Sequence, residues 1–471
     1  MRTLISGGIV LGAAGAVQAD VLIDGEQIAA VGTSLGPADR SIRAAGRYVL
    51  PGGVDVHTHL ELATPNGVAC DDFATGTKAA ACGGTTTIID YAGHARGESL
   101  LAGLARWQAR AAGHAYIDYA FHMMIAEVND QVLAELASLV GAGVTSIKIF
   151  MAYPGVYMID DAQIYRILRE ADRLGILTAV HAENGAVIEE LRREYVTAGQ
   201  TGPPYHAASR PAPLEGEATS RLITLAELAG APVYIAHLSA AQALAAVQAA
   251  RDRGQRVYAE TCPQYLFLDE GLLAGPDGAR YVCSPPLRTA AAQQALWRGL
   301  QRGDLDVVAT DHCPFTAAQK ARGERDFTLI PNGLHGVEER LVLLYQGVVA
   351  GHISLARWVD LAATGPARLF GLYPRKGAVV PGADADLVVF DPAVEYRLSA
   401  AAHHSATDYS VYDGMPVRGR ADVVMQRGEV LIDADGFRGR LGAGQFLRRD
   451  LPGPEQAGEC HERHAHRPRR P

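Results

Sequence analysis

The segment Thr145–Tyr153, TSIKIFMAY, has the composition of a short β-strand with a lysine at its centre. Ile147 and Ile149 flank Lys148, and β-branched residues are typical of strands. A buried ammonium group costs free energy unless it is paired or chemically altered, so a lysine in an apolar strand needs an explanation. An isolated lysine in a strand usually faces solvent, and the surrounding sequence decides whether Lys148 is expected to do so.

This strand is one of eight apolar, strand-like runs that follow one another from about residue 50. The runs are GGVDVHTH (52–59), TTTIIDYA (85–92), YIDYAFHMMI (116–125), TSIKIFMA (145–152), LTAVHAE (177–183), PVYIAHLS (232–239), RVYAETC (256–262) and DVVATDHC (306–313). Segments with helical spacing separate most of them, for example at 71–82, 132–140, 161–174 and 241–253. Alternation of strand and helix predicts a parallel α/β architecture. Eight such units predict a (β/α)8 TIM-like barrel, to which we assign residues 51–372.

Both ends of the chain lack this alternation of strand and helix, and their sequences instead predict short strands joined by Gly/Asp turns. Residues 1–50 and 373–441 are expected to build one small β-sandwich domain beside the barrel. The start of the chain resembles a secretory signal peptide, because it combines an arginine with an apolar run. Four glycines interrupt that run, and Asp24-Gly25 predicts a hairpin, which favours strands. The tail, residues 442–471, is rich in Pro, Arg and His and is expected to be mobile or to lie at an oligomer interface.

The composition excludes several classes of protein. The 471 residues are 48% apolar, which permits a large core, and carry a formal net charge of −9 without a basic stripe before the last residues. This charge argues against binding to nucleic acid or to an anionic membrane surface. No apolar run is long enough for a transmembrane helix. The six cysteines form no CxxC pair, which indicates reduced thiols and a cytoplasmic protein.

Residues that can bind metal ions fall at the ends of the predicted strands. His57 and His59 are two residues apart and therefore point to the same side of their strand. The other candidates at strand ends are Lys148, His181, His237 and Asp311. Each alone is more simply explained as a buried polar residue with a hydrogen-bond partner. Together they converge on the carboxyl end of one barrel, where the active sites of such barrels lie, and predict a metal centre.

A metal centre also suggests a role for Lys148. An ammonium group would repel a cation, but a lysine whose amine has added CO₂ is an anionic carbamate with two oxygen ligands. Such a group can bridge two divalent cations, and two-metal sites of this kind are typical of hydrolases. This explanation accounts for a buried lysine better than exposure to solvent does.

Over nearly its whole length, the chain resembles the dihydropyrimidinase/D-hydantoinase family of cyclic amidohydrolases. The resemblance rests on PGGVDVHTHLE, DDFATGTKAAACGGTTTIID, SIKIFMAYPGVY, AVHAENG, AHLSA, CSPPLR, ATDHCPF and IPNGLHGVEERL. It implies hydrolysis of the ring amide of 5,6-dihydropyrimidines or 5-substituted hydantoins to N-carbamoyl amino acids. It also implies a cytoplasmic homotetramer or homodimer that acts on a small cyclic imide or ureide.

The resemblance assigns a role to each candidate residue. His57, His59 and Asp311 hold the more buried metal ion, His181 and His237 hold the second, and the carbamate of Lys148 bridges the two. The metal is expected to be zinc, with manganese or cobalt as alternatives. A hydroxide that bridges the metals attacks the carbonyl carbon, and Asp311 acts as general base and then general acid. The oxyanion is stabilised by Tyr153, and backbone groups of Ser284 and Asn332 bind the substrate.

Residues around these positions have weaker assignments. Asp55 is expected to support the histidines from behind. Cys313 is expected to line the pocket rather than to act as a nucleophile. Candidate walls for the exocyclic substituent of the substrate are Phe150, Tyr157 and residues of the loops near Leu62–Val68 and near His94.

Three alternatives remain open at this point. The collapsin response mediator proteins share the fold and work as interaction proteins, but they lack parts of the metal site, whereas every ligand position is filled here. Dihydroorotases typically carry an arginine two residues after the second histidine, where this chain has Glu61, whose charge would repel the substrate carboxylate. Allantoinase is the third alternative, but FMAYPG and CSPPLR fit hydantoinases better.

Overall fold

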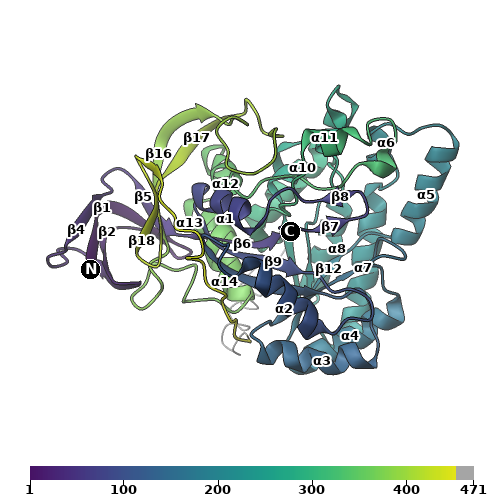
Figure 1. Cartoon of the computed structure of the whole chain (residues 1–471), viewed down its shortest axis with the longest axis horizontal. Coiled ribbons are helices and arrows are strands. Elements are labelled where there is room, and N and C mark those ends of the chain that lie inside the picture. The colour runs from purple at the N-terminus through teal and green to yellow at the C-terminus, as the bar shows by residue number, and fades with distance from the viewer. Residues whose placement is uncertain (452–471) are drawn as a thin grey trace.

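The computed structural model, which describes residues 1–451, consists of a barrel and a β-domain that lie side by side (Figure 1). Eight parallel strands form the barrel in the order β15-β14-β13-β12-β11-β10-β9-β6. They are β6 (Gly53–Thr58), β9 (Thr85–Ala92), β10 (Asp118–Met124), β11 (Ser146–Phe150), β12 (Leu177–His181), β13 (Val233–Ile235), β14 (Val257–Thr261) and β15 (Val307–Val308). The N–H of His59 donates to the carbonyl of His312 over 2.8 Å, which joins the last strand region to the first. The predicted barrel is confirmed, and each of the eight apolar runs contributes one strand.

The composition of these strands follows from their position. Every residue of β6, β9, β10, β11 and β12 is buried, because helices cover the outside of the barrel and side chains fill its inside. The longer helices are α1 (Phe73–Cys82), α2 (Leu100–Ala111), α3 (Asp130–Gly141), α4 (Asp161–Leu174), α5 (Gly185–Thr197), α7 (Ala212–Ala229), α8 (Ala241–Asp252), α10 (Ala290–Arg302) and α12 (Arg340–Val349). The shorter ones are α6 (Pro204–Ala208), α9 (Pro263–Phe267), α11 (Ala317–Ala321), α13 (Leu355–Val359) and α14 (Gly365–Leu369).

Helix α4 illustrates why these segments are helical. Asp160 caps its N-terminus in a capping box with Gln163, and Gly175 ends the helix in the left-handed conformation. Ile164, Ile167 and other apolar residues recur at helical spacing and are buried on one face.

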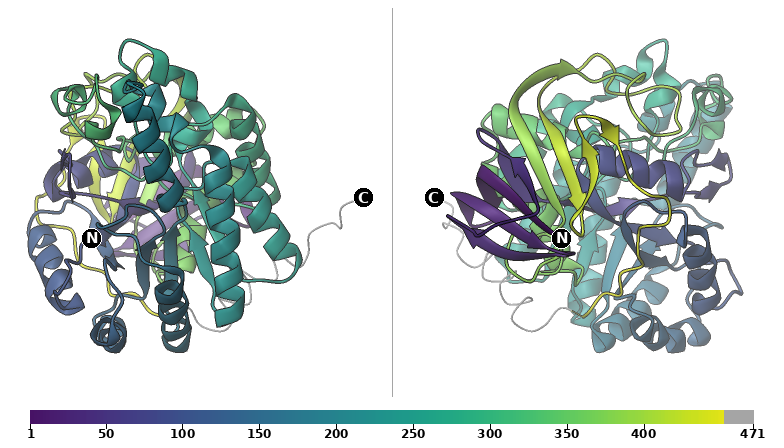
Figure 2. Two further views of the ribbon diagram at one scale, coloured as in Figure 1. Left: turned by 90° about the vertical axis from the view of Figure 1, so that its right-hand side faces the viewer. Right: turned by 60° about the vertical axis from the view of Figure 1, so that its left-hand side comes forward.

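The β-domain is one mostly antiparallel sheet built from both chain ends. Its nine strands run in the order β19-β18-β17-β16-β5-β1-β2-β3, with β4 paired to β1. They are β1 (Arg2–Gly12), β2 (Gly15–Asp24), β3 (Gln27–Gly32), β4 (Arg40–Arg43), β5 (Tyr48–Pro51), β16 (Leu387–Arg397), β17 (Pro416–Gln426), β18 (Glu429–Asp433) and β19 (Gly436–Phe437). Strand β5 pairs with β16, so the purple N-terminal strands lie beside the yellow-green C-terminal strands (Figure 2). The prediction of a β-domain from both ends is confirmed, and the start of the chain forms strands, with the expected hairpin at Asp24-Gly25.

Residues 442–451, which we assigned to the tail, bind to the barrel of the same chain. The N–H of Leu447 donates to the carbonyl of Tyr119 over 2.7 Å, and that of Arg449 to the carbonyl of Gly143 over 2.9 Å. The rest of the predicted tail, residues 452–471, lies outside the described residues. Among residues 1–451, no helix combines the length and the apolar character needed to span a membrane.

Candidate active site

A cavity of about 350 Å³ opens at the carboxyl ends of the barrel strands. Five of the predicted metal ligands line it, together with all three residues predicted to contact the substrate. These eight residues are His59, Lys148, His181, His237, Asp311, Tyr153, Ser284 and Asn332. The sixth predicted ligand, His57, is fully buried and does not contribute to the cavity surface.

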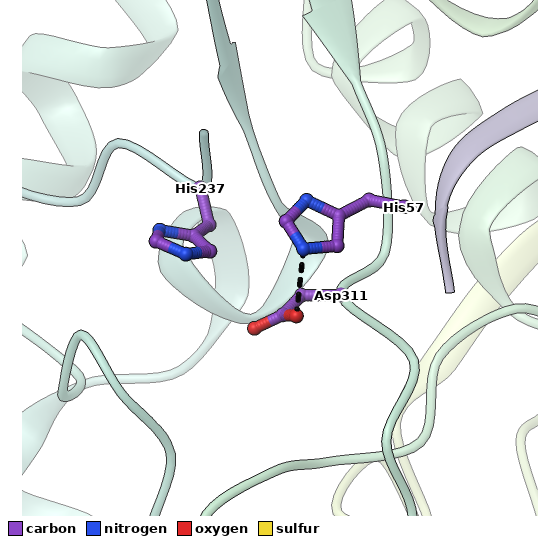
Figure 3. A group of neighbouring side chains, drawn as sticks. All are labelled: His57, His237 and Asp311. Carbon is purple, nitrogen blue, oxygen red and sulfur yellow. Dashed lines mark ion pairs between the residues drawn. The ribbon is translucent and has the colours of Figure 1, made fainter. Parts of the chain in front are cut away.

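Three of the predicted ligands, His57, His237 and Asp311, point toward one another from different strand ends (Figure 3). One possible ligand atom of each lies within 4.8 Å of the other two. Asp311 Oδ1 is 3.0 Å from His57 Nε2 and 3.1 Å from His59 Nε2. The ring centroids of His181 and His237 are 4.5 Å apart. Imidazole nitrogens and a carboxylate grouped in this way suit a transition metal such as zinc.

Lys148 is buried in β11, so the alternative that it faces solvent is wrong. Its Nζ has no hydrogen-bond partner among residues 1–451, and it lies 5.1 Å from the ring centroid of Tyr91 and 5.5 Å from that of Phe150. Burial lowers the pKa of Lys148 to about 8, which increases the fraction of neutral amine, the form that can add CO₂. A buried, unpartnered amine that lines the same cavity as the histidines and Asp311 therefore fits conversion to a carbamate.

Glu260, which was not among the predicted site residues, contacts the ring of His57 and the backbone of His237. Its fully buried carboxylate accepts hydrogen bonds from His57 Nδ1, from the hydroxyl of Tyr234 over 2.6 Å and from the N–H of His237 over 3.0 Å. Burial lowers the pKa of His57, but the carboxylates of Glu260 and Asp311 outweigh it and raise the pKa to about 9. A carboxylate on the far ring nitrogen fixes the tautomer and increases the basicity of the nitrogen that remains for a metal.

Asp55 supports His57 through the backbone. Its carboxylate accepts hydrogen bonds from the backbone N–H of His57 over 3.2 Å and from the Thr310 hydroxyl over 2.6 Å. It thus holds the backbone of β6 against the loop that carries Asp311, rather than a histidine ring.

Glu183 plays the corresponding part for His181. It accepts hydrogen bonds from His181 Nε2 over 2.7 Å and from Arg210 Nη1 over 2.6 Å. Burial raises the pKa of Glu183, but Arg210 and His181 outweigh this effect and lower the pKa to about 2. The guanidinium carbon of Arg210 lies 5.3 Å from the ring centroid of Tyr153, so one chain of contacts runs from His181 to that tyrosine.

The three predicted substrate-contact residues line the same cavity as the predicted ligands, and the ring centroid of Tyr153 lies 5.2 Å from that of His181. The hydroxyl of Ser284 lies 3.2 Å from His206 Nε2, and burial raises the pKa of Tyr153 to about 12. Among residues 1–451, the backbone N–H and carbonyl groups of Ser284 and Asn332 make no hydrogen bonds. Backbone polar groups are rarely left unpaired, so these groups are available to a ligand.

Three site residues have a strained backbone. Tyr153, His237 and Asp311 have φ values of 66°, 37° and 53°, in the left-handed region that non-glycine residues seldom adopt. Such conformations concentrate at functional sites, where the surrounding structure compensates for their cost.

Some of the expected pocket walls are in place and others are not. Phe150, Tyr157, Cys313 and residues of the 62–66 loop line the cavity. Residues 93–99, the loop around His94, do not line it, and the ring of His94 is hydrogen-bonded to the carbonyl of Glu98 and the N–H of Ala126. Glu61 is also absent from the lining and lies 3.6 Å from Arg110, so it cannot repel an acidic substrate there as we expected.

Comparison with known proteins agrees with this geometry. Residues 48–431 match the amidohydrolase family. The chain is 50% identical to a D-hydantoinase from Streptomyces coelicolor, over 95% of this chain and 98% of that protein. It is 46% identical to a D-hydantoinase from Ralstonia pickettii, over 95% and 99% of the two chains. The crystal structure of dihydropyrimidinase from Brevibacillus agri superposes with a TM-score of 0.95 at 47% identity, covering 96% of this chain and all of that one. The chain therefore belongs to the amidohydrolase family, and within it to the group of dihydropyrimidinases and D-hydantoinases.

Proposed function

We propose that this enzyme opens the ring of 5-substituted hydantoins and 5,6-dihydropyrimidines at the amide bond and releases N-carbamoyl amino acids. The observation that carries the proposal is a single cavity that is lined by predicted metal ligands and by Ser284 and Asn332, whose backbone groups make no hydrogen bonds among residues 1–451. The relatives named D-hydantoinase and dihydropyrimidinase support the same substrate class.

Two divalent metal ions complete the proposed site. His57, His59 and Asp311 would hold one ion, His181 and His237 the other, and carbamylated Lys148 would lie between them. Among residues 1–451, His59 Nδ1, His237 Nδ1 and the amine of Lys148 have no hydrogen-bond partner, which fits this use. We propose zinc, with manganese or cobalt as substitutes, because imidazole and carboxylate ligands suit these ions. When bound, such ions polarise a carbonyl group and lower the pKa of water.

The side chains then have distinct tasks. Burial raises the pKa of Asp311, but the neighbouring His57 and His59 outweigh it and hold the pKa well below its usual range, so the side chain is an ionised carboxylate. In that form it can act as the group that accepts a proton from the attacking water and passes it to the leaving nitrogen. Tyr153 keeps its proton at neutral pH, because burial raises its pKa to about 12, and can donate a hydrogen bond to the oxygen that becomes negative.

The unpaired backbone groups explain the choice of ring. A cyclic imide or ureide presents N–H and C=O groups that alternate along a flat edge. Backbone donors and acceptors of Ser284 and Asn332 can pair with such an edge without a charged side chain. A site built to bind a substrate N–H strongly disfavours analogues that lack it.

A substrate panel tests the proposal. The purified enzyme would be assayed with dihydrouracil, hydantoin, 5-phenylhydantoin, allantoin and dihydroorotate, and the products identified by mass. We expect the highest kcat/KM for a hydantoin or dihydrouracil and an N-carbamoyl product. Allantoin or dihydroorotate as the best substrate would contradict the proposal. Absence of any turnover by protein that holds its divalent metal would favour an interaction protein instead.

The expected homotetramer or homodimer and the cytoplasmic location remain predictions from the family resemblance. Static light scattering of the purified protein would measure the mass of the assembly, and fractionation of the source cells would test the location.

A further inference from the structure

Lys320 is a buried lysine outside the site described above. The chain has only four lysines among its 43 lysines and arginines, and three of them, Lys148, Lys320 and Lys376, are almost completely buried. Lys376 forms ion pairs with three aspartates, at 2.7 to 3.0 Å. Lys320 has no carboxylate within ion-pair distance among residues 1–451, and it does not line the cavity. A buried lysine without a counter-charge requires another reason for its presence.

The partners of Lys320 are two backbone carbonyls. From helix α11, its Nζ donates to the carbonyl of Val282 over 2.7 Å and to that of Gly333 over 2.8 Å. The N–H of Gly333 also donates to the carbonyl of Val282, over 3.1 Å. These three hydrogen bonds join the loop that contains Val282 to the loop that contains Gly333, about fifty residues later in the sequence. We call this contact between the two loops the junction.

These loops are the ones that carry the unpaired backbone groups. Val282 lies two residues before Ser284, and Gly333 directly follows Asn332. A displacement at the junction would therefore move the groups expected to face the substrate, and a change in their separation would spoil pairing with a flat imide edge.

The surroundings of Gly333 and of the Lys320 amine are closely packed. A Cβ atom at Gly333 would lie 2.4 Å from the carbonyl oxygen of Cys313, and the Phe315 ring centroid is 5.6 Å from the Lys320 amine. Burial lowers the pKa of Lys320 to about 7. A neutral amine has two N–H groups, which match the two carbonyls without a buried net charge. Arginine, with a rigid fork of five donors, is not an equivalent substitute.

We propose that Lys320 is a positioning residue for substrate recognition, which sets the spacing between the backbone groups of Ser284 and Asn332 and thereby selects a flat edge with an N–H between two carbonyls. The inference rests on the function proposed above. It differs from that function in assigning selectivity to a residue that the substrate does not touch.

The role predicts a particular kinetic pattern. Contacts with the imide edge are present in both the bound substrate and the transition state, so their loss weakens binding in both. In Lys320→Met, which keeps the aliphatic stem and removes the donor, we expect KM for a 5-substituted hydantoin to rise about tenfold and kcat to stay within about threefold. The metal content should equal that of the wild type, because Lys320 contacts none of the predicted ligands.

Selectivity gives a second readout that a loss of stability alone would not change. The derivative methylated on the nitrogen between the two carbonyls lacks the N–H, and the wild type should discriminate strongly against it. We expect the ratio of kcat/KM between the parent hydantoin and this derivative to fall by about tenfold in Lys320→Met. Lys320→Gln, which retains an N–H donor on a shorter stem, should show an intermediate ratio and serves as the test if the methionine variant does not fold.

The control is Lys78→Met, the same change at a half-buried lysine that stacks on Phe437 in the β-domain. It should leave both KM and the ratio unchanged. Wild-type KM and wild-type discrimination in Lys320→Met and Lys320→Gln would overturn the positioning role while leaving the proposed function intact. Failure of the wild type to hydrolyse any ring imide would refute the proposed function itself and the positioning role with it.

Discussion

Replacement of Glu260 by glutamine should weaken metal binding without unfolding the barrel. In the wild type, Oε1 of Glu260 accepts from His57 and from the His237 N–H, and Oε2 accepts from the Tyr234 hydroxyl. A glutamine can keep its oxygen toward the two histidines and direct its NH₂ group at Tyr234, whose hydroxyl can rotate to accept. The hydrogen bonds are then preserved, and the main loss is the negative charge.

The loss of that charge sets the size of the effect. Glu260 is the largest influence that raises the pKa of His57, so His57 becomes a weaker base and a weaker ligand in Glu260→Gln. Changes of this kind behind a metal ligand cost about 10- to 100-fold in metal affinity. In Glu260→Leu, by contrast, three buried donors lose their acceptor at about 1–3 kcal/mol each, which should prevent stable folding.

The assay is a titration of chelated protein with buffered zinc, followed by bound metal and by activity. The matched control is Glu215→Gln, a buried carboxylate with several hydrogen bonds that contacts Ser239 and Arg288 but none of the predicted ligands. We expect weaker zinc binding in Glu260→Gln only. Equal zinc affinity in Glu260→Gln and the wild type would refute the role assigned to this carboxylate.

Three further perturbations test other parts of the account. Lys148→Ala should abolish activity and reduce bound metal, and short carboxylic acids should restore part of both by occupying the place of the carbamate; near-normal turnover would exclude a bridging role. Tyr153→Phe should retain its metal and lose about 10²–10³ in kcat, because one hydrogen bond to the developing oxyanion is gone, and an unchanged kcat would make Tyr153 a packing residue. Lys376→Met should destabilise the fold by about 3–5 kcal/mol, since it removes the shared cation of three buried aspartates, of which Asp118 and Asp384 keep an arginine partner and Asp386 does not. Burial lowers the pKa of Lys376, but the three aspartates outweigh it and raise the pKa, so its contribution to stability is complete below the ordinary value of 10.5 and is lost as the pH rises above it. Urea unfolding of the wild type and the variant at several pH values checks this, and an equal difference in stability at pH 8 and pH 12 would contradict it.

The barrel and the candidate ligands could be predicted because their signals are local. Each strand is a continuous apolar run, and each candidate ligand lies at or near the carboxyl end of such a run. Because the strands are parallel, these residues all lie at the same end of the barrel. Glu260 has the same kind of signal as Lys148, an ionisable residue inside an apolar strand, and this signal could have found it. Glu183 stands two residues after His181 and could have been found on the same ground.

Other features have no local signal. Lys320 donates hydrogen bonds to Val282 and Gly333, and Arg210 donates one to Glu183. These partners are far apart in the sequence and become neighbours only when the chain folds. The error about Glu61 has a similar cause, since its contact with Arg110 depends on the course of the loop after β6. Residues 442–451 bind the barrel through backbone groups, which their composition does not reveal.

The most direct test of the account is hydrolysis of a 5-substituted hydantoin in water labelled with ¹⁸O, followed by mass spectrometry of the product. The account predicts one heavy oxygen in the carboxylate of an N-carbamoyl amino acid and none in the carbamoyl group, because attack falls on the amide carbonyl next to the ring carbon. Label in the carbamoyl group, or a free amino acid formed without an N-carbamoyl product, would contradict it.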